Sequence, residues 1–393
     1  MTPSQDSLVA AQAALATADW AAAKGHFESA LREQESPEAH DGLGIALWWL
    51  NDVAAAHQQR MLAYVGYRNC GELPRAALIA TWLAREQVFL HANGSAMNGW
   101  FARAARLLGQ AGPCAEQGWF TILRASMLAA PEELRQAALQ AMDVARAFGD
   151  PELEAMALAF QGLASVTLGE VENGMLCLDE AMAAATGGEL RDFMVASEVF
   201  CVMLSACELA GDLVRTENWC RIASDFAQRH ACPFLSAYCR TTYGSLLLAT
   251  GRWQDAETEL LAAIRSFESG HRGLRVHAVL KLADLRVSQG RLEEAQVLLA
   301  GYEDHGAAVV PLARLHLARG EVQLAYALLR QALGSAPSGT PGRAPLLMAL
   351  VVVLLAQGDL NAAADMAEEL VLCAQQAGGD LLLAQAELAK GVV

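Results

Sequence analysis

The heptapeptide QGRLEEA, at residues 289–295, is the clearest indication of the fold, because close variants of it recur along the chain. Each copy places a glycine second, a polar residue third, a hydrophobic residue fourth and usually a small residue last. The clear copies are LGEVENG (168–174), AGDLVRT (210–216), TGRWQDA (250–256), RGEVQLA (319–325) and QGDLNAA (357–363). Weaker copies are ADWAAA (18–23), NDVAAA (51–56) and NGSAMNG (93–99), and MLAAPEEL (127–134) lies where a further copy is due. These copies give ten units at an average step of about 38 residues, which indicates a repeat protein.

Each unit is predicted to be two helices joined by a tight turn. Apolar residues beside the turns recur at the helical spacing i, i+3, i+4 and i+7, and no strong run alternates as a strand would. The glycine suits the left-handed backbone that closes a helix, and the polar residue after it suits the start of the next helix. Turns are therefore expected near Gly169, Gly211, Gly251, Gly290, Gly320 and Gly358, and in the weaker copies at Ala18, Asn51, Gly94 and Pro131.

Small residues occupy matching positions on the two sides of the turn, as in Gly162 with Gly174 and Gly244 with Ala256. Such pairs let two antiparallel helices approach closely. The pattern resembles the tetratricopeptide repeat, although the step is longer than the ~34 residues of that repeat. The resemblance implies an all-α, right-handed superhelical solenoid of about ten helix pairs, with a concave face lined mostly by the first helix of each pair. We expect one solenoid over residues 1–393, with aromatic-rich repeats at 1–148 and more regular repeats at 149–393.

Charge and composition exclude several classes of function. The chain has 393 residues, a formal net charge of −16 and 54% hydrophobic residues, which argues against intrinsic disorder. A negative chain lacks the basic footprint that duplex DNA or an anionic membrane requires, so neither is an expected partner. The longest apolar run, at 346–356, is too short to span a bilayer, which needs ~20 residues. The start has no basic segment typical of a secretory signal, so we expect a cytoplasmic protein with reduced thiols.

Several longer stretches resemble a particular kind of helical-repeat region. These include EAHDGLGIALWWLNDVAAA (38–56), MNGWFARAARLL (97–108), GPCAEQGWF (112–120), the long stretch 149–190, CRTTYGSLLLATGRWQDAETELLAA (239–263) and LADLRVSQGRLEEAQVLLAGYEDH (282–305). Together they resemble the tetratricopeptide region of LuxR-type (MalT-like) bacterial transcriptional regulators. The resemblance implies a region that binds an effector or a partner and precedes a helix-turn-helix domain. That domain's motif is absent here, because residues 344–393 hold six acidic residues and one basic residue.

No sequence motif points to an enzyme, a metal or a cofactor. There is no phosphate-binding GxxxxGK[ST] loop, no HExxH and no GxSxG elbow. Cys201, Cys207, Cys220, Cys232 and Cys239 fall close together in the sequence, and could form a thiol sensor or a soft-metal site. We favour the alternative that they are buried as small hydrophobic residues.

Two sets of residues are candidates for the binding groove. The first is aromatic: Trp48 and Trp49 end the first helix of the second unit, and Trp82 follows in the third. They form either an aromatic ligand platform or bulky core packing. Adjacent helical side chains diverge by about 100°, so we predict that Trp48 and Trp49 divide between core and groove. The second set is polar, and the repeat alignment places on the groove side Tyr238, Thr241, Ser245, His277, Asp284 and Arg314.

Two hypotheses of function follow. The first is an effector-sensing or protein-interaction region of a LuxR-type regulator, whose concave groove binds a protein, a peptide or a small molecule. The second is a stand-alone repeat protein that sequesters a small molecule in an aromatic-lined cavity. A homodimer is compatible with both hypotheses, and direct binding of nucleic acid with neither.

Overall fold

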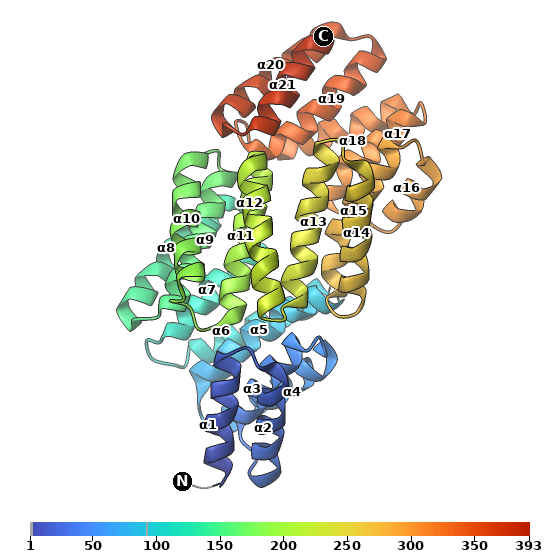
Figure 1. Cartoon of the computed structure of the whole chain (residues 1–393). Coiled ribbons are helices and arrows are strands. Elements are labelled where there is room, and N and C mark those ends of the chain that lie inside the picture. Colours follow the sequence, from blue (N-terminus) through green and yellow to red (C-terminus); the bar gives the residue numbers. More distant parts are fainter. Residues whose placement is uncertain (1–2, 92) are drawn as a thin grey trace.

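The computed structural model describes residues 3–91 and 93–393, and within them every regular element is helical (Figure 1). Consecutive antiparallel helices form ten pairs and α21 (Asp380–Val392) follows as a single helix. The pairs are α1 (Pro3–Ala16) with α2 (Trp20–Glu33), α3 (Pro37–Trp49) with α4 (Val53–Asn69), α5 (Leu73–His91) with α6 (Gly94–Leu108), α7 (Ala115–Leu128) with α8 (Pro131–Phe148), α9 (Pro151–Thr167) with α10 (Val171–Gly187), α11 (Phe193–Ala210) with α12 (Leu213–Arg229), α13 (Pro233–Ala249) with α14 (Trp253–Glu268), α15 (Arg275–Ser288) with α16 (Leu292–Leu299), α17 (Val309–Ala318) with α18 (Val322–Ser335), and α19 (Ala344–Gln357) with α20 (Leu360–Ala377). Short 3₁₀ turns, η1 (Arg272–Leu274), η2 (Gly306–Ala308) and η3 (Pro341–Arg343), precede α15, α17 and α19. The prediction of an all-α solenoid of about ten pairs is confirmed.

The turns lie where the repeat phrase predicts them. All six predicted turn glycines have a positive φ, between 69° at Gly211 and 93° at Gly169. Ala18 and Asn51, which replace glycine in the weaker copies, adopt the same conformation with φ of 58° and 62°. Gly94 and Pro131 are instead the first residues of α6 and α8, a place that comes two residues after the glycine in the clear copies.

The predicted pairs of small residues are the points of closest approach between the helices of a pair. A methyl group on Gly162 of α9 would lie 2.7 Å from the carbonyl oxygen of Gly174 on α10, and one on Gly174 would lie 2.6 Å from that of Gly162. A methyl group on Gly244 of α13 would lie 2.8 Å from the Leu260 side chain of α14. At Gly162 and Gly174 the obstacles include main-chain atoms, so only glycine permits that approach without a shift of the backbone.

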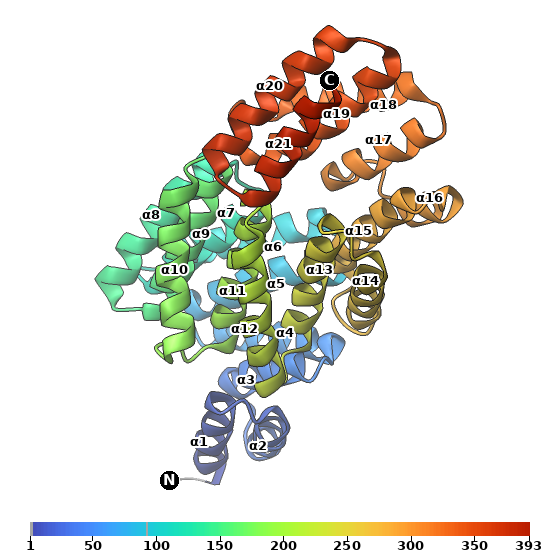
Figure 2. The same ribbon diagram turned by 45° about the horizontal axis from the view of Figure 1, so that its top comes forward.

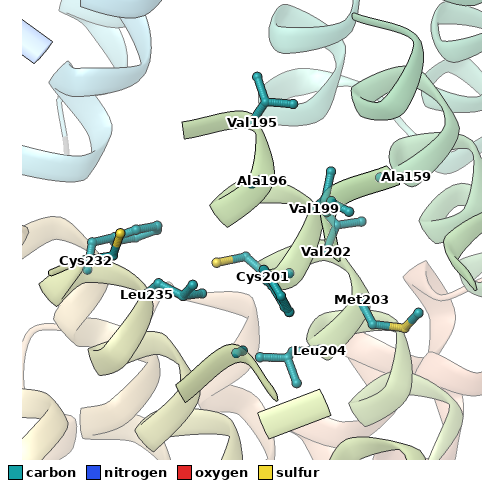
Figure 3. Close-up of a cluster of buried hydrophobic side chains, with 14 of the residues drawn as sticks. Ala159, Val195, Ala196, Val199, Cys201, Val202, Met203, Leu204, Cys232 and Leu235 are labelled. Atoms are coloured by element: carbon teal, nitrogen blue, oxygen red, sulfur yellow. The ribbon is translucent and has the colours of Figure 1, made fainter. Parts of the chain in front are cut away.

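The core is continuous through the middle of the solenoid, and α11 is its most buried helix. Among the described residues it is the one helix with the length and hydropathy to cross a membrane, yet 72% of it is buried inside the fold. Val199, Phe200 and Leu204 of α11 are fully buried, and Figure 3 shows Val199 and Leu204 within a cluster of buried side chains. A position between α9, α12 and α13 makes α11 a core helix.

The superhelix turns tightly enough for its successive levels to touch, so that helices far apart in the sequence lie side by side (Figures 1 and 2). The Trp20 indole donates a hydrogen bond to the carbonyl oxygen of His230 at 2.8 Å. The Asn51 amide donates to the Ser269 hydroxyl at 2.9 Å. These contacts place the first turns of the chain against the loops before α13 and α15.

A second contact between levels lies nearer the C-terminus. The backbone N–H of Leu381 donates to the carbonyl oxygen of Gly211 at 3.1 Å. On the neighbouring pair, a methyl group on Gly169 would lie 2.9 Å from the carbonyl oxygen of Gly339. The start of α21 therefore lies on the end of α11, and the loop before η3 lies on the turn after α9.

Candidate functional site

The first helices of the later pairs enclose a cavity of about 460 Å³ on the concave side of the solenoid. The walls come from α11, α12, α13, α15 and α21, together with Pro341 and Pro345. Four of the predicted polar residues line it, namely Tyr238, Thr241, Ser245 and His277. Each repeat presents the same face of its first helix inward, which is why the alignment located them.

A second cavity of about 730 Å³ adjoins the first. The remaining two predicted polar residues, Asp284 and Arg314, line it between α15 and α17. Leu381 and Gln385 of α21 lie in the walls of both cavities, together with Ala249 and Pro345. We call the two adjoining cavities the inner cleft. All six predicted polar residues belong to it.

An ion pair organises the polar wall of the first cavity. The Lys281 ammonium donates to the Glu208 carboxylate and, at 2.9 Å, to the Ser245 hydroxyl. Ser245 in turn donates to Glu208 at 2.8 Å. Burial would raise the pKa of Glu208, but the charge of Lys281 and the hydrogen bonds with Lys281 and Ser245 outweigh it and lower the pKa. Glu208 is therefore ionised at neutral pH.

Two other groups of the first cavity are neutral at that pH. Burial raises the pKa of Tyr238, whose hydroxyl lies 2.5 Å from that of Ser205. The His277 ring is exposed to the cleft, yet desolvation by the surrounding walls, and then the nearby His305 and Lys281, lower its pKa. His277 can therefore accept or donate one hydrogen bond without carrying a charge.

A second ion pair lies on the wall of the second cavity. The Arg314 guanidinium donates to the Asp284 carboxylate at 2.5 Å and to the Ser288 hydroxyl at 3.0 Å. Burial raises the pKa of Asp284, and the charge of Arg314 opposes that rise. Glu208, Lys281, Asp284 and Arg314 therefore give the wall from α11 to α17 charges that alternate in sign, and apolar surfaces lie between them.

The aromatic candidates do not lie in the inner cleft. Trp48 and Trp49 are both 3% exposed. Trp49 stacks on Trp20 with ring centroids 5.4 Å apart, and Trp48 meets the edge of His271 at 4.6 Å. The prediction that one of the two tryptophans meets an open groove is wrong, because the loop before α15 closes over this end of α3.

Trp82 is partly buried and belongs to a charged cluster inside the N-terminal repeats. Arg60 and Arg85 lie over its ring, at 5.9 and 5.4 Å from the centroid. Arg60 pairs with the buried Glu86, and Arg85 pairs with Glu198 of α11 at 2.5 Å. The aromatic surface that we predicted for a ligand is therefore covered by arginines of the same chain.

The cysteines between residues 201 and 239 are buried hydrophobic side chains, as favoured from the sequence. Figure 3 shows Cys201 and Cys232 among valine and leucine side chains of the core. Burial raises the pKa of Cys207, Cys232 and Cys239 to about 12, so these thiols stay protonated at neutral pH. No group of three or more metal-ligating side chains occurs within the described residues.

Three charged or amide side chains of the inner cleft were not predicted from the sequence. Lys281 lies four residues after His277, so the helical period would have placed it on the same face. Glu208 lies in the last turn of α11, a helix whose copy of the repeat departs from the small-residue pattern. Gln385 lies on α21, and no repeat phrase follows that helix to give its register.

Comparison with known proteins supports the fold and assigns no family. No family profile matches the chain, and no curated protein matches it by sequence. Among solved structures, a Rap protein complexed with competence and sporulation factor matches with a TM-score of 0.57 at 13% identity, over 96% of this chain and 99% of that one. Yeast Tom70 matches over 99% of this chain and 96% of its own with a TM-score of 0.38 at 13% identity. The chain has a tetratricopeptide-type helical-repeat fold.

Proposed function

We propose that this chain is the effector-sensing or partner-binding region of a LuxR-type transcriptional regulator, and that the inner cleft is its binding site. The observation that carries the proposal is the convergence of polar side chains from α11, α13, α15 and α17 on one apolar cleft. The resemblance of the non-repeat connectors to that regulator family supplies the biological context. The Rap structure supports it by analogy, since its helical-repeat chain is complexed with a competence and sporulation factor.

The dimensions of the cleft favour a small molecule or a short peptide. Its cavities of about 460 and 730 Å³ fall within the range of roughly 300–1,000 Å³ that is common for ligand sites. Apolar walls supply burial, and the pairs Glu208–Lys281 and Asp284–Arg314 supply fixed charges that orient a ligand. A folded protein domain would not enter such a space.

Binding would act through the shape of the solenoid. Each pair contacts mainly its neighbours, so small shifts between pairs add up along the array. An effector that bridges α11 and α17 would change the pitch of the superhelix or its self-association, and so the spacing of attached DNA-binding domains. This mechanism requires no catalysis, no cofactor and no nucleic-acid contact by this chain, and it places the protein in the cytoplasm.

The alternative is a stand-alone protein that sequesters a small molecule. The size of the cleft favours this alternative equally. The aromatic residues that we expected to line such a site are, however, covered by other side chains of the chain. An open reading frame that continues past Val393 into a helix-turn-helix domain would favour the regulator.

The test is native mass spectrometry of the protein purified from its own host. We expect a bound mass that is lost on Ser245→Trp, which fills the first cavity, and is kept on Thr258→Trp, which places the same ring on the exposed face of α14. A bound mass that survives Ser245→Trp, or none in the wild type, would contradict the cleft as the site. The same spectra show whether the protein is a homodimer.

A further inference from the structure

The contact between α21 and α11 rests on two glycines that meet across levels of the solenoid. A methyl group on Gly379 would lie 1.9 Å from the carbonyl oxygen of Ala210 and 2.7 Å from the carbonyl carbon of Gly211. A methyl group on Gly211 would lie 2.7 Å from the Leu382 side chain. No other residue type allows the two backbones to come this close.

The same contact forms a wall of the inner cleft. Gly211, Leu381 and Leu382 line the first cavity, and Leu381 and Leu388 line the second. Figure 2 shows α21 in front of the space between α11 and α17. Any movement of α21 away from α11 therefore opens both cavities at once.

The structure also provides a hinge for that movement. Gly378 ends α20 in the left-handed conformation with φ of 71°, and Gly379 follows as the residue before α21. Two successive glycines give the chain more backbone freedom here than any other pair of residues would. Across the gap, one hydrogen bond from Leu381 and the packing of Leu382 on Gly211 join α21 to α11, while the more extensive contacts of α21 are with α19 and α20.

α21 also presents a polar group to the cleft. The side-chain oxygen of Gln385 is buried and accepts no hydrogen bond within the described structure. A buried acceptor without a donor is unfavourable, so an N–H group of a bound molecule would improve its environment. The helix that closes the cleft can therefore also bind a ligand in the cleft, through the side-chain oxygen of Gln385.

We infer that α21 is a gate: it swings at Gly378–Gly379 to admit a ligand to the inner cleft and closes against Gly211 at the end of α11. The inference rests on the proposed function for its biological purpose, but its geometry is independent of which ligand binds. Closure of the gate over an N–H-bearing ligand would link occupancy of the cleft to the contact between two levels of the superhelix.

Cys207 offers a native reporter of the gate. It is fully buried, lines the first cavity and lies next to the closure, whereas Cys220 is buried at an outer cavity between α12 and α13. The experiment is alkylation with N-ethylmaleimide, followed by peptide mass mapping of each cysteine. Gly379→Ala pushes the start of α21 off Ala210. The matched control is Gly391→Ala in the same helix, where a methyl group meets nothing within 4 Å.

We expect Gly379→Ala to speed the labelling of Cys207 about tenfold, because loss of one hydrogen bond and one apolar contact shifts a local opening equilibrium by about that factor. Labelling of Cys220 should not change, and Gly391→Ala should change neither rate. Equal Cys207 rates in the two variants, or a common increase at every buried cysteine, would overturn the gate. In the wild type, the amides of α21 should exchange with deuterium before those of α20, and simultaneous exchange would also overturn it.

The outcomes separate the gate from the proposed function. A bound mass that depends on Ser245, with unchanged Cys207 labelling, would keep the cleft as a site and reject the gate. Faster Cys207 labelling in a protein that retains no ligand would support the gate and reject the site.

Discussion

Gly174→Ala is the substitution whose effect the structure determines most directly. Gly174 lies on α10, where a methyl group would approach the Gly162 carbonyl oxygen at 2.6 Å and the backbone nitrogen of Val166 at 2.8 Å. Both obstacles are main-chain atoms of α9 and cannot rotate away. The two helices must therefore separate, and the packing between them must loosen.

The expected magnitude is a difference between two effects. Alanine in place of a helical glycine stabilises a helix by about 0.8–1 kcal/mol. Overpacking of a close contact typically costs about 1–3 kcal/mol. We expect the free energy of unfolding to fall by about 1–2 kcal/mol in total, because a clash with backbone atoms places the overpacking cost near the upper end of its range. Gly187→Ala, at the last residue of the same helix, meets nothing within 4 Å and should be neutral or slightly stabilising.

The assay is urea unfolding of the wild type and both variants, followed by circular dichroism at 222 nm. The midpoint should fall for Gly174→Ala and hold or rise for Gly187→Ala, with similar slopes. A Gly174→Ala protein as stable as the Gly187→Ala protein would refute the close approach of α9 and α10.

Four further expectations follow from the fold. Trp48→Ala and Trp49→Ala should each lower the free energy of unfolding by about 3–5 kcal/mol, measured in urea, because both rings are core; a loss at only one of them would show that the other is dispensable for packing. Ala256→Leu should cost about 1–3 kcal/mol at the α13–α14 contact, and an unchanged melting temperature would contradict our register. Burial lowers the pKa of His271 to about 4, whereas the unfolded residue titrates near 6.5, so protons favour the unfolded chain as pH falls from 6.5 to about 4. Lowering the pH from 7 to 5 should therefore remove about 2 kcal/mol of stability, and His271→Gln should flatten that dependence in urea titrations at each pH. The chain alone should not shift duplex DNA in an electrophoretic assay at ~150 mM salt, and submicromolar binding would contradict this.

The parts of the fold that the sequence predicted are those set by local chemistry. Gly169 and Asn51 mark turns because a left-handed residue follows the first helix in most of the pairs. Gly162 and Gly174 mark a close approach because small residues recur at the same spacing from the turn in most units. Tyr238 and Asp284 line the inner cleft, and the repeat alignment could point to them because it transfers one inward face from helix to helix.

The parts that were missed depend on how far the superhelix turns, which no single repeat encodes. Trp48 has the position of a groove residue, but His271, more than two hundred residues later, covers it. Gln385 enters the cleft only because α21 returns to the end of α11. The small rotations between successive pairs add up along the chain and bring these distant residues into contact. The repeat pattern in the sequence does not specify the size of those rotations.

The contacts between levels also change how this solenoid should unfold. An open repeat array behaves as a one-dimensional chain, in which each unit is stabilised only by its two neighbours and the ends fray independently. Here the bond from Leu381 to Gly211, and that from Trp20 to His230, tie each end of the array to its middle. Loss of the last helix would destabilise the sixth pair, and loss of the first pair would destabilise the same sixth pair from the other side. Such a molecule should melt in fewer and more cooperative steps than its ten repeats suggest.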